Sequence, residues 1–137
     1  MPVTIFERVS NSFAQQQFMT TLGATLLSVK PGAVEIAVPF RADLTQQNVF
    51  LHAGVITSIL DSACGYAALS VAPENADVLS VEFKVNLLSP AVGGRFVARA
   101  QVKRAGRKIT VSTADAFAIN GTNEKLIATM LATIITT

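Results

Sequence analysis

The segment from Leu51 to Ala72 contains the single histidine and the single cysteine of the chain, together with one aspartate, in an otherwise small, apolar or hydroxylated run. His52 stands at its start and Asp61 follows nine residues later. Imidazole and carboxylate groups transfer protons in enzymes, and an isolated carboxylate in apolar surroundings suits a base or a nucleophile. These two residues are therefore the first candidates for chemistry.

Three kinds of structure account for about twenty mostly apolar residues: a membrane span, a buried core helix, or a core helix that holds a site. A charge near the centre of a span is costly in lipid, and Asp61 occupies that position. Hydroxyl groups dilute the run further, at Thr57, Ser58, Ser62 and Ser70. The segment is therefore predicted to be a core helix, and no membrane association is expected.

The composition indicates one domain that associates with itself. A chain of 137 residues is most simply a single domain, here residues 1–137. Half of the residues are hydrophobic and 15% are charged, which is apolar for a monomer and suggests that some apolar surface is buried against other copies. The net charge of +2 is too small to indicate a nucleic-acid partner.

The cysteine content and the N-terminal residues favour the cytoplasm. One cysteine cannot form an internal disulfide, and the sequence has no cysteine and histidine cluster of the zinc type, so no metal site is expected. The first eighteen residues lack a basic start followed by an unbroken apolar run, which argues against a signal peptide.

The elements before the central helix are a helix and a hairpin. Thr4 to Glu7 forms a capping box, and Phe6, Val9 and Phe13 follow at helical spacing, which predicts a helix over about Ile5 to Gln17. Two strands, within residues 25–38, flank the turn signal at 30–32. An irregular connection then leads to His52.

The elements after the central helix are all strands. Apolar and polar residues alternate along 80–87 and 95–103, and two further strand patterns follow within 108–119 and 125–135. Five or six antiparallel strands and one long apolar helix pack best when the sheet curves around the helix. The predicted class is therefore α+β, a curved antiparallel sheet of five to six strands wrapped around one long central helix.

This order of elements resembles the hotdog fold, and one motif resembles the active-site signature of acyl-CoA thioesterases of the PaaI (phenylacetic acid degradation) type. The motif is Gln46-x5-His52-Ala53-Gly54-x6-Asp61, with alanine where the first glycine of the usual pair stands in that family. A second block, which begins at Ser80 and reaches a proline ten residues later, is also similar. The resemblance extends over about residues 20–137.

The spacing between His52 and Asp61 predicts a dimer. Nine residues of α-helix span two and a half turns, with a rise of about 13.5 Å, so the two side chains point to opposite faces. Two antiparallel copies of the helix would instead place the start of one opposite the middle of the other. The resemblance implies the same composite sites in a homodimer, which is expected to assemble into a homotetramer.

The resemblance also implies roles for the residues at the helix start and at Asp61. The N–H groups of Ala53 and Gly54 would bind the oxygen of a thioester carbonyl as it becomes an oxyanion. Asp61 would be the base for a water molecule or the direct nucleophile. Alanine keeps the N–H group at position 53, but its methyl group narrows the space beside the carbonyl.

The remaining motif residues have supporting roles in this interpretation. Gln46 would orient the water or the carbonyl, and Ser80 matches a hydroxyl near the acidic residue. His52 would hold the loop or assist the thiolate leaving group. Purely structural roles are the alternatives: a helix N-cap or loop anchor for His52, and a local hydrogen bond for Asp61. Cys64 is expected to be a small core residue.

Six of the eleven basic residues fall between positions 95 and 108. Basic side chains at a pocket rim suit the phosphate groups of coenzyme A, and those near the turn are favoured: Arg104, Arg107 and Lys108. A solvated hairpin edge is the alternative. Coenzyme A would be part of the substrate, so no separate cofactor is expected.

The sequence thus predicts a cytoplasmic acyl-CoA thioesterase that releases a free acid and coenzyme A without a metal. The first alternative is a non-catalytic acyl-CoA-binding or regulatory hotdog protein, because Ala53 departs from the usual motif. The second is a hotdog hydratase or dehydratase. The motif of those enzymes is an acidic residue followed five positions later by a histidine. In this chain the order is reversed, because His52 precedes Asp61.

Overall fold

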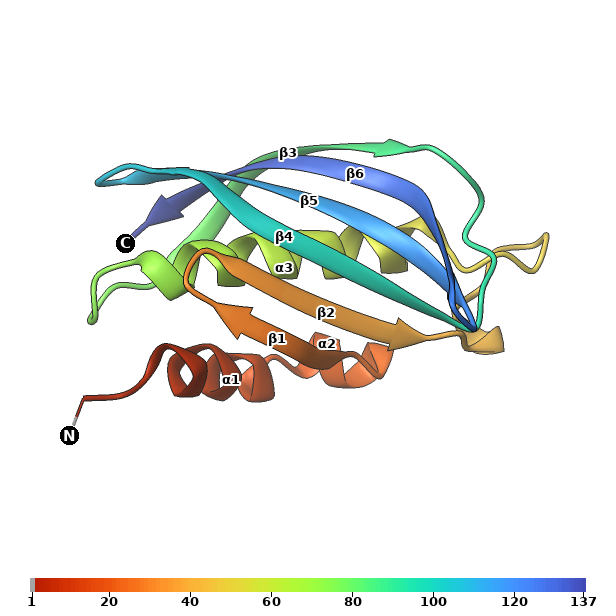
Figure 1. Ribbon diagram of the computed structural model, residues 1–137, viewed down its shortest axis with the longest axis horizontal. Coiled ribbons are helices and arrows are strands. Elements are labelled where there is room, and N and C mark those ends of the chain that lie inside the picture. The colour runs from red at the N-terminus through yellow and green to blue at the C-terminus, as the bar shows by residue number, and fades with distance from the viewer. Residues whose placement is uncertain (1) are drawn as a thin grey trace.

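A six-stranded antiparallel sheet curves around one long helix in the computed structural model of the chain, which describes residues 2–137 (Figure 1). The elements occur in the following order: α1 (Ile5–Gln15), α2 (Gln17–Leu22), β1 (Thr25–Lys30), β2 (Ala33–Pro39), the short 3-10 helix η1 (Ala42–Leu44), α3 (Ala53–Val71), β3 (Val78–Leu87), β4 (Arg95–Ala105), β5 (Ile109–Asn120) and β6 (Asn123–Thr136).

The strand order is β1-β2-β4-β5-β6-β3, and every neighbouring pair is antiparallel. Two tight turns between strands use glycines in the left-handed conformation: Gly32 joins β1 to β2 with φ 77°, and Gly121 joins β5 to β6 with φ 59°. The α+β hotdog architecture predicted from the sequence, with six strands, is confirmed.

Helix α3 forms the centre of the core and contacts all six strands. By length and apolar composition it is long enough to cross a membrane, but 61% of its most apolar stretch is buried inside the described structure. Its buried side chains, such as Ile59, Leu60 and Ala63, pack against inward-facing residues of the sheet such as Ala98 and Ala116. The small residues on β4 and β5 let the sheet approach the helix closely.

One face of α3 is left uncovered by the sheet, and we call it the open face. Its residues recur every three or four positions and are all small or polar: Gly54, Thr57, Ser58, Asp61, Ser62 and Gly65. None of these six is buried, whereas Val55, Ile59 and Leu60 on the other faces are. A helix that is wrapped on most sides therefore presents one polar stripe outward.

The N-terminal helix begins as predicted but ends earlier. Thr4 Oγ1 accepts a hydrogen bond of 3.1 Å from the Glu7 N–H, and Glu7 Oε1 accepts one of 3.2 Å from the Thr4 N–H, so the capping box is present. Gln16 has an extended backbone, which ends α1 at Gln15 and separates it from α2. Of the three apolar residues at helical spacing, Val9 and Phe13 face the core, whereas Phe6 is 59% exposed.

Strand β3 forms one edge of the sheet and exposes apolar side chains. Leu79 is 64% exposed, Val81 58% and Phe83 44%. The pairing of β3 with β6 shifts between Ser80 and Glu82, so a bulge lies at the start of the strand. A long apolar edge of this kind is a ready surface for pairing with another strand.

Candidate active site

Asp61 lies halfway along the open face of α3, and its carboxylate is held by β3. Ser80 Oγ donates a hydrogen bond of 2.7 Å to Asp61 Oδ1. The contact joins the helix to the edge strand and leaves Oδ2 free of side-chain hydrogen bonds within residues 2–137. Both residues line a cavity of about 310 Å³. The predicted pairing of a hydroxyl with the acidic residue is therefore present in the geometry.

Cys64, about one helical turn after Asp61, is fully buried in the core. Burial, and next the nearby Asp61 carboxylate, raises the pKa of its thiol to about 12. The thiol therefore stays protonated at neutral pH and is a poor nucleophile. Cys64 is a core residue, as the sequence predicted.

His52 is the N-cap of α3, and this local contact explains why glycine follows two positions later. Its Nδ1 accepts a hydrogen bond of 2.7 Å from the Gly54 N–H, so the proton of the neutral ring lies on Nε2. A Cβ atom added at Gly54 would approach His52 Nδ1 to 2.9 Å, closer than real contacts allow. The imidazole can therefore cap the helix because residue 54 is a glycine, which has no Cβ atom to displace the ring.

Ala53 and Gln46 lie together in a second cavity, of about 360 Å³, at the start of α3. Within the described residues, no acceptor takes the N–H of Ala53, which is the first residue of the helix. The Gln46 side-chain carbonyl accepts a hydrogen bond from the Asn48 N–H, which leaves its Nε2 group without an acceptor in residues 2–137. Two residues that line this cavity therefore carry N–H donors without an acceptor in residues 2–137.

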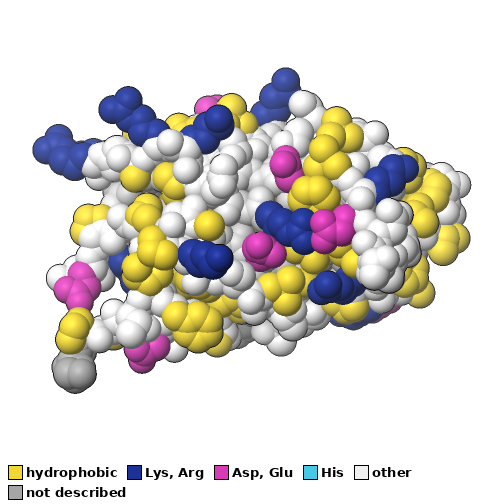
Figure 2. Space-filling view, in the orientation of Figure 1, with side chains coloured by type: hydrophobic (Ala, Val, Ile, Leu, Met, Phe, Trp, Pro, Cys, Tyr) yellow, Lys and Arg dark blue, Asp and Glu magenta, His cyan; other side chains and the backbone are white. Residues whose placement is uncertain are grey.

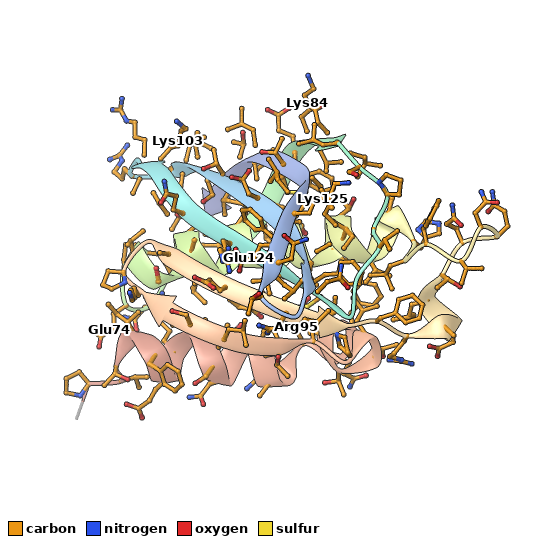
Figure 3. The ribbon with its side chains drawn as sticks, turned by 45° about the vertical axis from the view of Figure 1, so that its right-hand side comes forward. Glu74, Lys84, Arg95, Lys103, Glu124 and Lys125 are labelled. Carbon is orange, nitrogen blue, oxygen red and sulfur yellow. The ribbon has the colours of Figure 1, made fainter. Side chains whose placement is uncertain are left out.

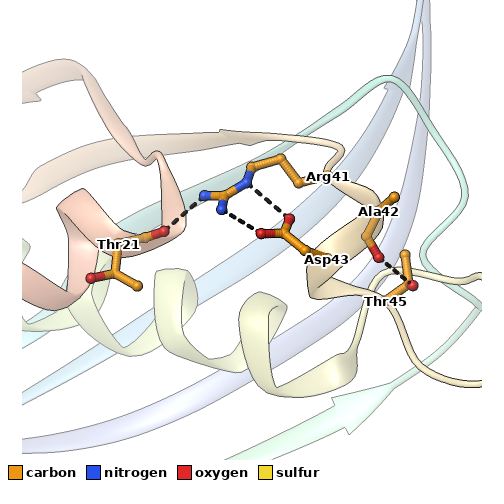
Figure 4. A network of polar contacts seen from close by, with 5 residues as sticks. All are labelled: Thr21, Arg41, Ala42, Asp43 and Thr45. Carbon is orange, nitrogen blue, oxygen red and sulfur yellow. Dashed lines mark hydrogen bonds and ion pairs between the residues drawn. The ribbon is translucent and has the colours of Figure 1, made fainter.

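The connection that presents Gln46 is fixed at its beginning by Arg41 (Figure 4). The Arg41 guanidinium forms a two-point ion pair with Asp43, at 3.1 and 2.7 Å, and also donates a bond of 2.8 Å to the Thr21 carbonyl at the end of α2. The hydrogen bond from Arg41 holds the pKa of the Asp43 carboxyl below its usual value. This network ties the connection to the N-terminal helices.

The tip of the same connection is strained. Val49 has a φ of 68°, which places a β-branched residue in the left-handed region that costs about 1–2 kcal/mol. The turn is closed by a 3.0 Å bond from the Val49 N–H to the Gln46 carbonyl and a 2.9 Å bond from the Gln46 N–H to the Phe50 carbonyl. The Val49 side chain is 68% exposed at the tip.

The motif residues therefore form two separate groups within one chain. Asp61 and Ser80 line one cavity near the middle of α3, and Gln46 and Ala53 line another at its start. The cavity beside Asp61 is not lined by Gln46 or Ala53, and the cavity at the helix start is not lined by Asp61 or Ser80. A complete site between two chains, which the nine-residue spacing predicts, stays a prediction.

The basic residues of 95–108 also divide into two groups. Arg99 pairs with Glu124 at 2.6 Å and with Glu35 at 3.4 Å and lies over the Phe117 ring at 4.7 Å, which occupies it structurally. Figure 3 shows Arg95 and Lys103 toward opposite ends of β4. The residues favoured for coenzyme A, Arg104, Arg107 and Lys108, line a shallow hollow at the β4–β5 turn and form no ion pair within residues 2–137.

The β4–β5 turn lies at one end of the molecule, and the connection that contains Gln46 lies at the other (Figure 1). Lys and Arg side chains gather over the end where that turn projects (Figure 2). Within one chain, the basic hollow is therefore far from Gln46 and Ala53. Any site that uses both requires a second chain.

The structure places a third polar group beside Asp61, which sequence patterns do not indicate. Ser62 Oγ donates to Gln16 Oε1 at 3.1 Å, and Gln16 Nε2 donates to Tyr66 Oη at 2.9 Å. Ser12 Oγ also donates to Tyr66 Oη, at 3.3 Å. These contacts depend on the break in the N-terminal helix at Gln16, which brings residues about fifty positions apart in the sequence together. No local sequence pattern reveals them.

Substitution of Gly54 by alanine tests the fit between the helix start and His52. We expect Gly54→Ala to displace the imidazole and remove an N-cap contact worth about 1 kcal/mol, while alanine offsets much of that loss through its better helix propensity. The melting temperature should therefore change little, and any activity should fall by about 10²-fold, the usual cost of a misplaced group. The measurements are thermal unfolding and steady-state turnover.

The matched control is Ala53→Gly, which exchanges the same two residue types one position earlier. It should keep the His52 contact and clear a methyl group from the second cavity, and it is expected to retain or raise activity. Gly54→Ala with unchanged turnover would show that the imidazole position does not matter.

Comparison with known proteins gives a consistent assignment. The sequence profile of the thioesterase superfamily matches residues 48–125. A Saccharolobus solfataricus protein provisionally named an esterase is 30% identical over 95 residues, which cover 69% of this chain and 67% of the relative. The structure of a thioesterase family protein from Silicibacter pomeroyi is 52% identical, with a TM-score of 0.94 over 96% of this chain and 97% of that one.

More distant structures share the fold. The Escherichia coli PaaI protein, from the phenylacetic acid degradation operon, superimposes with a TM-score of 0.85 at 19% identity, over 96% of this chain and 91% of that chain. Together with the profile match and the Silicibacter pomeroyi structure, this likeness confirms the family resemblance.

Proposed function

Because the chain belongs to the thioesterase superfamily, we propose that it hydrolyses acyl-CoA thioesters at composite sites between two copies. The observation that best supports this proposal is the position of Asp61. Its carboxylate is on the open face, hydrogen-bonded to Ser80 and beside a cavity, but it is separated from the free N–H donors of Ala53 and Gln46. A second chain supplies the missing half.

Two unpaired surfaces of the chain lie on the same side and fit a second copy. The contact between Asp61 and Ser80 places the open face of α3 beside the β3 edge. That edge exposes Leu79, Val81 and Phe83, which a monomer would leave in water. In a twofold dimer the two β3 edges would pair antiparallel and the two open faces would lie against each other.

The composite site fixes the register of such a dimer. In a twofold pair of antiparallel helices, residues equally far from the axis lie opposite each other. If Ala53 of one chain faces Asp61 of the other, the axis passes the midpoint at Thr57. Thr57 and the neighbouring Ser58 are small and lie on the open face, so two helices can approach closely there.

In the proposed reaction, the Ala53 N–H binds the thioester oxygen of the substrate. Gln46 Nε2 orients the carbonyl or the water. A water molecule gives a proton to the Asp61 carboxylate and attacks the carbonyl carbon, the negative oxygen is stabilised by the N–H donor, and the C–S bond then breaks. The coenzyme A thiolate leaves and takes up a proton from the protonated Asp61 carboxyl or from water, and a hydrogen bond from His52 Nε2–H would stabilise it as it leaves.

The same carboxylate permits a second route, in which Asp61 attacks the carbonyl carbon directly and water hydrolyses the resulting anhydride. The two routes differ in the source of the oxygen in the first product molecule. In a single turnover in ¹⁸O-water, direct water attack labels the released acid. Attack by Asp61, followed by attack of water on the Asp61 carbonyl carbon of the anhydride, gives unlabelled acid in the first turnover and leaves the label on the protein. Label on the protein therefore identifies the route through Asp61.

The proposed dimer also brings the basic hollow to the site. The β4–β5 turn and the Gln46 connection are at opposite ends of one chain. An antiparallel partner therefore places its Gln46 connection toward this chain's β4–β5 turn. Arg104, Arg107 and Lys108 would then contact the phosphate groups of coenzyme A at the rim of the composite site.

The direct test is incubation of the purified protein with a panel of acyl-CoA thioesters and a thiol-reactive dye. We expect release of free thiol at a rate that saturates with substrate and is unaffected by chelators. Saturable binding of acyl-CoA without thiol release would favour the alternative of a binding or regulatory protein, which the alanine at position 53 makes the closest rival. Sedimentation of the same sample distinguishes a dimer from a tetramer.

A further inference from the structure

Gly65 is one helical turn after Asp61 on the open face, in a position where glycine has no local structural role. Glycine in a helix interior destabilises the helix relative to alanine, because it loses more conformational freedom on folding. A Cβ atom built at Gly65 meets nothing within 4 Å, so packing within the chain does not require glycine. Its φ is not in the left-handed region either. The glycine keeps a space open beside Asp61.

That space belongs to the 310 Å³ cavity, and its far wall is fixed by side-chain hydrogen bonds. Gln16 reaches the cavity from the break between α1 and α2 and is held by Ser62 and Tyr66, at 3.1 and 2.9 Å. Tyr66 is only 7% exposed, and its ring packs on Phe13 at a centroid distance of 6.0 Å. Since the wall is held from both sides, the cavity has a definite end.

We propose that Gly65 determines the length of acyl group that the enzyme accepts, with Gln16 and Tyr66 as the closed end of the acyl pocket. The inference rests on the proposed function, since it uses Asp61 to fix where the thioester carbon lies. An acyl group attached to that carbon begins beside Asp61 and extends along the open face past Gly65. A polar wall that is already hydrogen-bonded disfavours a long alkyl chain, so the expected substrates have short acyl groups.

A side chain of the second copy is the alternative occupant of the space beside Gly65. With the twofold axis at Thr57, Gly65 of one helix lies beyond the start of the other helix at Ala53, toward the connection that precedes it. Val49 is exposed on a strained turn, and its side chain in the second copy would be the group nearest Gly65. If that side chain filled the space, Gly65 would serve dimer packing and would not determine acyl length.

The test uses S-alkyl-CoA thioethers with two to ten carbons, which bind but cannot be hydrolysed. Their dissociation constants are measured by calorimetry for the wild type, Gly65→Ala, Gly65→Leu and Gln16→Ala. We expect Gly65→Leu to weaken binding of the six-carbon relative to the two-carbon thioether by about 10–100-fold, the usual effect of a few methylene groups in a pocket.

Gln16→Ala should shift the preference toward longer chains. Asn11→Ala, which raises helix propensity on exposed α1, is the control with an unchanged profile.

The acyl-CoA assay run beside it separates this inference from the proposed function. Hydrolysis by the wild type with a length profile that Gly65→Leu leaves unchanged would overturn the inference and keep the function. A length profile that shifts in the thioether series, without any hydrolysis, would keep the pocket and overturn the function. Loss of the dimer in Gly65→Leu, with recovery in Gly65→Leu combined with Val49→Ala, would assign the space to the second copy and overturn the inference.

Discussion

Replacement of Asp61 by asparagine is expected to reduce turnover by about 10²–10⁴-fold, the scale of a positioned acid or base, without loss of the fold or the oligomer. Asparagine has the size of aspartate and still accepts the hydrogen bond from Ser80 Oγ through its carbonyl oxygen. It lacks the negative charge needed to take a proton from water or to attack the thioester. The measurement is kcat on the best acyl-CoA substrate, with circular dichroism and sedimentation of the same samples.

The chain offers a closely matched control for this experiment. Asp115 on β5 accepts a hydrogen bond of 2.7 Å from Thr129 Oγ1, the same carboxylate–hydroxyl pair that Asp61 forms with Ser80. Asp115 lies on the outer face of the sheet, away from α3. Asp115→Asn should therefore retain full turnover. If Asp61→Asn also retains near wild-type kcat, Asp61 has no part in the mechanism.

The fold and the register of the motif could be predicted because both depend on short-range patterns. Alternation along residues 80–87 and 95–103 predicts strands, and a helix that is apolar on most sides needs a sheet around it. The capping box at Thr4 and Glu7 and the turn at Gly32 are likewise local. Gln46, His52 and Asp61 could be selected together because the family motif fixes their spacing along the chain.

The remaining features depend on contacts between distant parts of the chain. The Val49 conformation is set by the closure of its turn, and the contact between Gln16 and Tyr66 by a helix break, so neither follows from residue propensities. The exposure of the apolar side chains of β3 could not be predicted from the sequence either. Alternation predicts two faces for a strand, but it does not reveal that β3 lies at an edge where its apolar side chains are exposed in a single chain.

The open face of α3 was visible in principle. Its six residues recur at helical spacing and are all small or polar, while the rest of the helix is apolar. Counted only as polar residues within an apolar run, the hydroxyl groups give no position on the helix. Placed on the helix, Thr57 and Ser58 mark the surface where a second helix can lie, and Asp61 is on that surface.

The strongest test of the composite site is complementation between two inactive variants. Asp61→Asn removes the carboxylate, and His52→Ala removes the side chain that holds the helix start at Gly54. In a hybrid dimer one site combines the intact His52 of one chain with the intact Asp61 of the other, whereas the second site contains both lesions. Co-expression of the two variants, each first shown to be inactive alone, should therefore restore activity.

The amount of recovery is also predicted. With equal amounts and random pairing in a twofold dimer, about half of the dimers are hybrids and each has one good site of two, so activity should approach about a quarter of the wild type. Differently tagged chains allow the hybrids to be purified, and these should reach about half of the wild-type activity. The amount of recovery separates complementation from residual activity of the single variants. Residual activity would raise the activity of the mixture, but it would not increase when the hybrids are purified. Purified hybrids that remain inactive would place the whole site within one chain and exclude the antiparallel-helix dimer, since Ala53 would then have to reach Asp61 along about 12 Å of its own helix.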